Sequence, residues 1–246
     1  MRNIKLTLAY DGTDYKGWQH QKNGITIQQV LTEKLERLCK HKITLRTAGR
    51  TDAGVHAKGQ VTNFQTDATI PIERITKALN GMLPKNIIVY RAEEVEQDFH
   101  AGFSATSKTY RYVIDNGAYP DIFASRFAFY EPWKLDVAAM TEVSEIFLGK
   151  HDFRSFCAAG GSSKTFVRTI KSLKINTIGN YIYIDITADG FLYHMVRNIV
   201  GLLLKTGLGR LTKAQAQLIL EACDRTKAPA TAPAKGLSLW EVQYEI

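Results

Sequence analysis

The feature that most restricts the fold of this chain is an order of strands and helices that occurs twice. The spacing of apolar side chains predicts β-α-β-β-α-β in residues 1–105 and β-α-β-β-α-α-β in residues 106–246. Two copies of a split βαβ unit are typical of α+β folds with mainly antiparallel sheets. We therefore expect two related halves, 1–105 and 106–246, with a binding cleft between them.

The elements of each half follow from local signals. Thr26 and Gln29 form the pattern of a capping box, which predicts a helix with Ile27, Leu31 and Leu35 on its apolar face. In the first half we expect the elements at 4–10, 27–38, 43–47, 60–65, 71–83 and 87–90. In the second half we expect them at 108–115, 137–148, 167–175, 181–187, 191–205, 213–222 and 237–244.

The composition favours a globular protein that meets a polyanion. Of the 246 residues 45% are hydrophobic, which is ample for a core, and the formal net charge is +8. The lysines and arginines are spread along the chain rather than gathered in a tail, as expected if a folded surface binds nucleic acid. Charge alone does not choose between RNA, DNA and a merely basic protein.

The cysteines and the apolar segments narrow the class further. Cys39, Cys157 and Cys223 are odd in number and far apart, which argues against a disulfide framework and against a zinc site. No apolar run reaches the length of about 18 residues that a membrane span needs, and the chain starts without the apolar core of a signal peptide. We expect a cytoplasmic protein.

A glycine-rich loop, Ala48–Gln60, is the segment that most suggests chemistry. Its glycines allow a bulky ligand to approach Asp52, whose carboxylate is a candidate nucleophile or base. Arg50 stands two residues before Asp52, so in an extended segment both side chains leave the same face. An ordinary turn with a surface ion pair is the alternative.

The loop and several other segments resemble the tRNA pseudouridine synthases of the TruA family. The stretch Gly49–His56 reads Gly-Arg-Thr-Asp-Ala-Gly-Val-His, which is the core of that family's catalytic loop. Further similar segments occur in the family's order, at 10–19, 108–112, 151–156, 190–198 and 232–237. The resemblance therefore covers nearly the whole chain.

The resemblance implies the pseudouridine synthase fold and isomerisation of uridine to pseudouridine in the anticodon arm of tRNA. In that reaction the base detaches from N1, turns and rejoins the ribose through C5. The resemblance also implies a homodimer that needs no metal and no organic cofactor. A carboxylate that is ionised at neutral pH can attack C1′ or take a proton from C2′, and Asp52 has this role by its motif position.

The resemblance also assigns substrate contacts. Tyr110 matches the family's active-site tyrosine, whose ring can stack on the uracil. From its position two residues before Asp52, and not from the resemblance, Arg50 can orient the Asp52 carboxylate or bind phosphate. Arg197 matches a position that points toward the cleft, where it pairs with Asp52 or contacts RNA. The structural alternatives are a core tyrosine for Tyr110 and a peripheral arginine for Arg197.

The candidate RNA contacts are basic residues expected near the cleft. A stacked uridine must be flipped out of the RNA, and contacts to phosphates offset that cost. The candidates are Lys58, Lys108, Arg111, Lys164 and Arg168. The alternative for each of them is an ordinary solvated charge with no role in RNA binding. His56 and His194 are weaker candidates with hydrogen-bonding or stacking roles. The chain departs from the family pattern at Gly102, where we expect an arginine that contacts RNA.

Two other classes of protein fit parts of the sequence. Cys157 with His151 and Asp152 is a candidate cysteine nucleophile with its base and orienting acid, although such groups usually come from distant segments. A non-catalytic RNA-binding module would stack bases on aromatic residues of its sheet, and the candidates are Tyr110, Tyr112, Tyr181 and Tyr183. Such a binder has no need of the Asp52 loop.

Overall fold

The computed structural model describes residues 1–161 and 163–245, and its contacts divide the chain into two compact units. The first unit contains Met1–Thr106 together with the C-terminal segment from Ser238, and the second contains Ser107–Leu237. The last strand thus groups with the first unit by its contacts. The two expected halves, 1–105 and 106–246, stay a prediction about functional domains.

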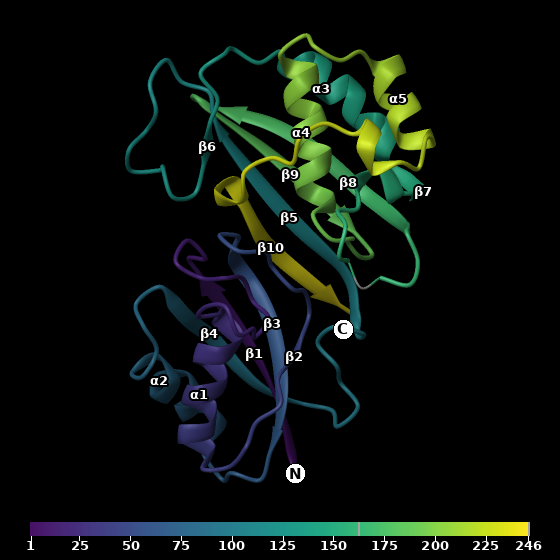
Figure 1. The fold of residues 1–246 in the computed structure, drawn as a ribbon. Helices are drawn as coiled ribbons and strands as arrows, with labels where there is room; N and C mark the ends of the chain where they lie inside the picture. Colours follow the sequence, from purple (N-terminus) through teal and green to yellow (C-terminus); the bar gives the residue numbers. More distant parts are fainter. Residues whose placement is uncertain (162, 246) are drawn as a thin grey trace. The chain divides into compact units, whose positions relative to one another are not determined.

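The first unit is a sheet with two helices (Figure 1). Its strands run in the order β4-β1-β3-β10, with β2 paired to β3, and only the β3–β10 pair is parallel among the pairs described in this unit. The strands are β1 (Arg2–Tyr10), β2 (Arg46–Thr47), β3 (His56–Thr66), β4 (Ile87–Val95) and β10 (Leu237–Tyr244), and the helices are α1 (Ile27–Cys39) and α2 (Ile72–Asn80).

Alternation along β1 builds the core of this unit. Ile4, Leu6 and Leu8 are fully buried, and because successive side chains of a strand point to opposite faces, all three lie on one face of the sheet. The apolar stripe of α1 supplies Leu31 and Leu35, which are also fully buried. Burial of each such side chain stabilises the fold by roughly 2 kcal/mol, so this face holds the helix in place.

Helix α1 begins where its sequence signal predicts. The Thr26 side chain accepts a hydrogen bond from Gln29 N at 3.3 Å and caps the helix. The Gln29 side chain donates to Glu33 at 3.1 Å, so it serves an i,i+4 pair on the helix surface. Helix α5 (Lys213–Glu221) has a full capping box, in which Thr212 and Gln215 satisfy each other's backbone.

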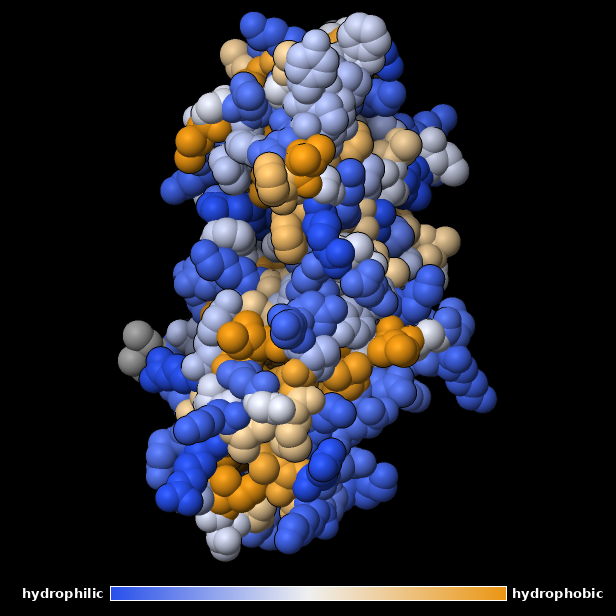
Figure 2. Space-filling model, turned by 90° about the vertical axis from the view of Figure 1, so that its left-hand side faces the viewer, coloured by the Kyte–Doolittle hydropathy of each residue, from blue (hydrophilic) through white to orange (hydrophobic). Residues whose placement is uncertain are grey.

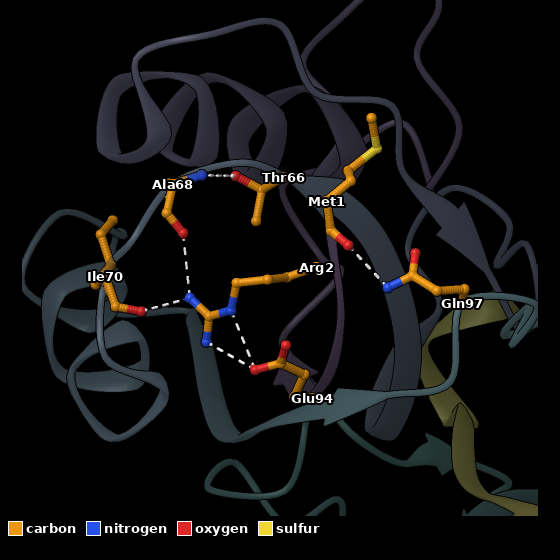
Figure 3. Close-up of polar contacts among 7 residues, drawn as sticks. All are labelled: Met1, Arg2, Thr66, Ala68, Ile70, Glu94 and Gln97. Carbon is orange, nitrogen blue, oxygen red and sulfur yellow. Dashed lines mark hydrogen bonds and ion pairs between the residues drawn. The ribbon is translucent and has the colours of Figure 1, made fainter.

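Arg2 ties the start of β1 to two other segments (Figure 3). Its guanidinium donates to the backbone oxygens of Ala68 and Ile70, at 3.1 and 2.7 Å, in the connection that follows β3. It also donates twice to Glu94 on β4, at 3.1 and 3.0 Å. The planar fork of an arginine suits such a three-way contact, which fixes this end of the sheet.

The second unit is again a sheet with helices, which gather on one side of it in Figure 1. Its strands run in the order β5-β9-β8-β7, all antiparallel, with β6 paired in parallel to β5. They are β5 (Ala105–Asp115), β6 (Phe129–Tyr130), β7 (Gly149–Asp152), β8 (Val167–Ile178) and β9 (Tyr181–Ala188). The helices are α3 (Val137–Ser144), α4 (Met195–Gly207) and α5 (Lys213–Glu221). The expected α+β class with mainly antiparallel strands is confirmed.

Some element bounds differ from the sequence prediction. Strand β3 begins at His56, so the end of the expected glycine loop is strand, whereas only Arg46 and Thr47 of the expected strand 43–47 pair. Helix α4 begins at Met195 and not at residue 191, because His194 adopts a φ of 59°, which a right-handed helix excludes. The expected helix 137–148 ends at Ser144 and continues only as a 3-10 turn.

Candidate active site

Asp52 lies in the connection between β2 and β3 and opens a tight turn. Val55 N donates to Asp52 O at 3.1 Å, and Gly54 inside the turn has a φ of 75°. Glycine adopts this left-handed conformation without steric cost. The side chain of Asp52 is half-buried. The sequence therefore presents the carboxylate from a turn of defined geometry.

The segment 11–18, between β1 and α1, holds this turn through backbone hydrogen bonds. Trp18 N donates to Thr51 O at 3.0 Å, directly before Asp52. Gly54 N donates to Tyr15 O at 3.3 Å, directly after it. The two segments are thus joined on both sides of the carboxylate, which limits the motion of its backbone.

Two glycines make this close approach possible. A Cβ atom at Gly12 would lie 2.0 Å from Val55 O, and one at Gly17 would lie 2.6 Å from Thr51 O. Gly17 also has a φ of 84°, which side chains rarely adopt. Both glycines are required by contact with the turn and not by flexibility.

A buried polar network lies behind the turn. Tyr10 Oη lies 2.7 Å from Thr51 Oγ1, and Gln60 Nε2 donates to Tyr10 Oη at 3.3 Å and to Gly49 O at 2.7 Å. Gln60 is fully buried, and its Oε1 accepts from Thr47 Oγ1 at 3.2 Å. Burial raises the pKa of Tyr10 well above its usual value, so its hydroxyl stays protonated. The network fixes the chain on both sides of the carboxylate.

Sequence reasoning did not single out Tyr10 and Gln60 as site residues. Tyr10 continues the alternation of Leu6 and Leu8 and is itself 4% exposed, so its ring belongs to the core. A buried tyrosine hydroxyl needs a polar partner, and this is the one signal that could have pointed to a network at this end of β1.

His56 follows the turn as a buried residue of β3. Its Nδ1 lies 3.0 Å from Gly12 N and 3.2 Å from Asp11 Oδ1. Accepting from Gly12 requires a lone pair on Nδ1, whereas donating to Asp11 requires a proton there, so the two hydrogen bonds do not form at the same time. Both partners of His56 lie in the segment 11–18, which is consistent with a hydrogen-bonding role for this side chain.

The two cationic candidates of the first unit are exposed. Arg50 lies at the surface two residues before Asp52. Lys58 is also exposed, and its Nζ lies 4.2 Å from the centroid of the Trp240 ring in a cation–π contact. Both side chains are accessible to a polyanion, and their roles stay predictions.

Tyr110 is buried in β5 of the second unit. It is 7% exposed, and its ring meets Phe191 edge to face with 5.0 Å between the centroids. Lys108 stands two residues earlier on the same face of the strand. Burial lowers the pKa of Lys108, and the charge of Arg168 adds to this effect while Asp189 opposes it. Tyr110 therefore has Phe191 as an aromatic neighbour and Lys108 on its face of the sheet.

Arg197 on α4 is anchored by a neighbouring segment of the second unit. Its Nε donates to Ala232 O at 2.8 Å, and Ala232 N donates to Arg197 O at 3.0 Å. The segment approaches so closely that a Cβ at Gly201 would lie 2.1 Å from Ala230 O. The half-buried guanidinium is thus oriented by backbone contacts rather than extended into solvent.

The remaining candidate RNA contacts differ in how many hydrogen bonds and ion pairs they form within the protein. Arg111 makes a bidentate ion pair with Asp185, its cross-strand neighbour, with both N–O distances at 2.7 Å. Arg168 donates to Val167 O at 2.6 Å and to Thr165 O at 3.1 Å. Lys164 is exposed. The ion pair gives Arg111 a structural role that competes with an RNA contact.

The cysteine-nucleophile alternative is disfavoured. Burial raises the pKa of the Cys157 thiol, which opposes formation of the reactive thiolate. The side chain of His151 contacts Leu148 O at 2.7 Å, and Asp152 pairs with Arg154 at 3.0 Å. His151 and Asp152 thus each have a local structural partner.

The RNA-binding-module alternative is also disfavoured. Tyr110 and Tyr112 pair with Ile186 and Ile184 and are buried on one face of the second sheet. Tyr181 and Tyr183 pair with Asp115 and Val113, at the odd positions of β5 that point to the opposite face. The four tyrosines therefore do not form one stacking surface.

Within the described residues, no three or more His, Cys, Asp or Glu side chains are grouped so that they could hold a metal ion. No helix of residues 1–161 or 163–245 combines the length and the apolar character that crossing a membrane requires.

Comparison with known families gives the class of protein to which this fold and the Asp52 turn belong. The chain matches the family described as tRNA pseudouridine synthase over residues 7–104 and 143–245, and it belongs to that family. The resemblance noted from the motifs is thereby confirmed. The match spans both units and includes Asp52 and Arg197, whereas Tyr110 falls between the two matched ranges.

Two relatives with similar names align with nearly the whole chain. The chain is 46% identical to tRNA pseudouridine synthase A 2 of Clostridium perfringens over 244 residues, which are 99% of this chain and 100% of that one. It is 48% identical to tRNA pseudouridine synthase A of Moorella thermoacetica, over 98% of this chain and 99% of that one. A solved Cbf5–Nop10–Gar1 complex is more remote, with a TM-score of 0.40 and 10% identity over 82% of this chain and 45% of that chain. The family assignment rests on the sequence relatives.

Proposed function

We propose that this chain isomerises uridine to pseudouridine in tRNA and that the Asp52 carboxylate acts at the ribose. The observation that supports this role most directly is the turn that presents Asp52, which the segment 11–18 and the Tyr10–Thr51–Gln60 network hold on both sides. A carboxylate held in one orientation can react without first reorganising its surroundings. Membership of the family supports the reaction itself.

The reaction exchanges one bond of the ribose for another. The N1–C1′ bond breaks, the C5–C1′ bond forms, C5 loses its hydrogen and N1 gains a proton. Asp52 attacks C1′ or takes a proton from C2′. Tyr110 stacks on the flipped uracil, Arg50 and Arg197 orient the carboxylate or bind RNA, and the phosphate contacts come from Lys58, Lys108, Arg111, Lys164 and Arg168.

The finer parts of the proposal come from the family resemblance. The substrate is the anticodon arm of tRNA, the enzyme is a homodimer, and it acts in the cytoplasm, where its substrate is. Light scattering at working concentration tests the dimer, and a monomer would remove that part of the proposal alone.

The decisive experiment measures tritium release from tRNA that carries 5-³H-uridine, because C5 must lose its hydrogen. We expect release with the wild type and none with Asp52→Asn, while both proteins bind tRNA with similar affinity. No release from any tRNA by the wild type would overturn the reaction. Release by Asp52→Asn above about a tenth of the wild-type rate would overturn the role of the carboxylate.

Two further variants separate the alternatives. Tyr110→Phe keeps the ring and should bind tRNA with little turnover, whereas a fully active variant would show that only the ring matters. Cys157→Ser should retain turnover. Loss of turnover in this variant would favour the hypothesis of a cysteine nucleophile.

A further inference from the structure

Hydrophobic side chains reach the surface of this chain at several places, and Figure 2 shows such patches, in orange, among hydrophilic residues on one face. Among the exposed aromatic residues of the first unit, Phe103 is supported by a second ring. Phe103 is 88% exposed, yet its ring rests on the ring of His100 with 4.2 Å between the centroids. A ring held in this way keeps one open face toward solvent.

The turn that carries Phe103 is closed by its own hydrogen bonds. His100 Nδ1 accepts from Gly102 N at 3.0 Å and from Phe103 N at 3.3 Å. Ser104 N donates to His100 O at 2.8 Å, and His100 N donates to Ser104 Oγ at 3.1 Å. The imidazole that supports the Phe103 ring is thus fixed to the backbone of the same turn.

Two fully buried asparagines anchor this turn to the sheet. Asn63 Oδ1 accepts from Ala101 N at 2.9 Å, and Asn63 Nδ2 donates to Phe99 O at 3.0 Å. Asn3 Nδ2 donates to Phe99 O at 3.1 Å. Tyr244 on β10 donates to Ala101 O at 2.9 Å. The position of Phe103 is therefore set by the core of the first unit.

The turn also lies against the strand that leads to Asp52. A Cβ atom at Gly102 would lie 2.9 Å from Thr47 O, so the two backbones are in contact. Thr47 donates to Gln60, and Gln60 donates to Gly49 O in the Asp52 loop. Glycine at this position removes the arginine expected there and leaves Phe103 as the prominent side chain of the turn.

We propose that Phe103, supported by His100, is a stacking site for an unpaired nucleobase of the RNA substrate. The inference rests on the proposed function, which supplies an RNA with a base flipped from its stack. Every base has a π face, and single-stranded nucleic acid binds exposed aromatic rings in cationic surroundings. Arg46, whose charge acts on His100, supplies such a cation. A flat ring fixed from one side suits a base better than it suits a deformable protein surface.

The test compares two exposed phenylalanines. Phe103→Ala should weaken tRNA binding and raise KM by about tenfold with little change in kcat, because stacking on a base is made before and during the reaction. Phe123→Ala is the matched control, since Phe123 is 91% exposed in the second unit, and it should stay within about twofold of the wild type. Equal affinities of the two variants would overturn the proposal.

A spectroscopic probe separates this inference from the proposed function. Phe103→Trp should restore binding, and tRNA should quench its added fluorescence, whereas heparin, a polyanion without bases, should not. Quenching without any tritium release would refute the proposed reaction and would still support the stacking site. Tritium release without quenching, or quenching by heparin alone, would refute the stacking site and would still support the proposed reaction.

Discussion

The hydroxyl groups of Tyr10 and Thr51 lie 2.7 Å apart in the interior of the first unit, one residue from Asp52. Tyr10 ends β1, whereas Thr51 belongs to the loop, so this hydrogen bond couples a core strand to the turn that carries the carboxylate. The Gln60 side chain donates hydrogen bonds both to Tyr10 Oη and to Gly49 O, which lies two residues before Thr51. The rigidity of the core is thereby transmitted to the site.

Removal of the Tyr10 hydroxyl should weaken both the fold and the reaction. Tyr10→Phe leaves buried polar atoms of Thr51 and Gln60 without that partner, which should lower the free energy of unfolding by about 1–2 kcal/mol. A looser Asp52 turn should lower kcat by roughly tenfold. Urea unfolding and single-turnover kinetics measure the two effects.

Tyr15→Phe is the matched control for this prediction. Tyr15 lies in the segment 11–18, and its hydroxyl donates to Asn86 at 2.8 Å rather than to Thr51. We expect Tyr15→Phe to cost stability without lowering kcat. Equal kcat values for Tyr10→Phe and Tyr15→Phe would contradict a positioning role of Tyr10.

Gly17→Ala should disturb the site through steric contact. Its φ of 84° costs about 1 kcal/mol for alanine, and the new Cβ would also meet Thr51 O at 2.6 Å. Gly179→Ala has a φ of 57° with no atom within 4 Å, so it carries the conformational cost alone. Thermal unfolding should show Gly17→Ala to be less stable than Gly179→Ala by about 2 kcal/mol, with turnover lost only in the former. Similar losses in both variants would mean that contact with the turn is unimportant.

His100 should titrate below the ordinary histidine pKa of about 6.5. Burial is the larger cause of its lowered pKa, and the charge of Arg46 is the second. The unfolded chain therefore takes up the proton first, so the stability that neutral His100 contributes is present above pH 6.5 and is lost as pH falls through the lower folded-state pKa.

NMR titration of labelled histidine, assigned with His100→Gln, measures this value directly. Arg46→Gln should move the pKa of His100 back toward the ordinary value. A midpoint at or above that of free histidine would contradict the effects of burial and of the Arg46 charge on the pKa of His100.

The salt dependence of tRNA binding should distinguish free cations from paired ones. Lys164→Gln should reduce the slope of log K against log salt by about 0.7–0.9, as expected for one lost phosphate contact. Arg111→Gln should change it less, because the Arg111 guanidinium is paired with Asp185. Filter binding between low and high salt measures both. A larger change for Arg111→Gln would make Arg111 the stronger RNA contact.

Local signals in the sequence predicted much of the fold. The cap at Thr26 placed the start of α1, and the alternation of residues 237–244 placed β10, because these signals depend only on neighbouring residues. The left-handed conformation of His194 delayed α4, and no residue pattern shows such a conformation. The parallel pairing of β10 with β3 joins Ser238 to His56, and periodicity carries no signal for contacts between such distant residues.

The same distinction holds for the candidate site. Asp52 stands out from its glycine-rich surroundings and from the family motif, both of which are properties of a short segment. The partners Tyr10, Thr51 and Gln60 meet only when β1, the loop and β3 are assembled. Their hydrogen bonds depend on tertiary structure, which is why a single sequence did not reveal them.

The parallel pairing of β10 with β3 also sets an order of events during synthesis. Ser238 and Leu239 lie opposite His56 and Ala57, only a few residues after Asp52, and the Trp240 carbonyl comes so close to Gly59 that a Cβ there would be 2.6 Å away. A ribosome must therefore translate the whole second unit before β3, which follows the Asp52 turn, gains this neighbour. Long-range pairing of this kind forms late, so the turn that carries Asp52 is synthesised long before the strand beside β3 is complete.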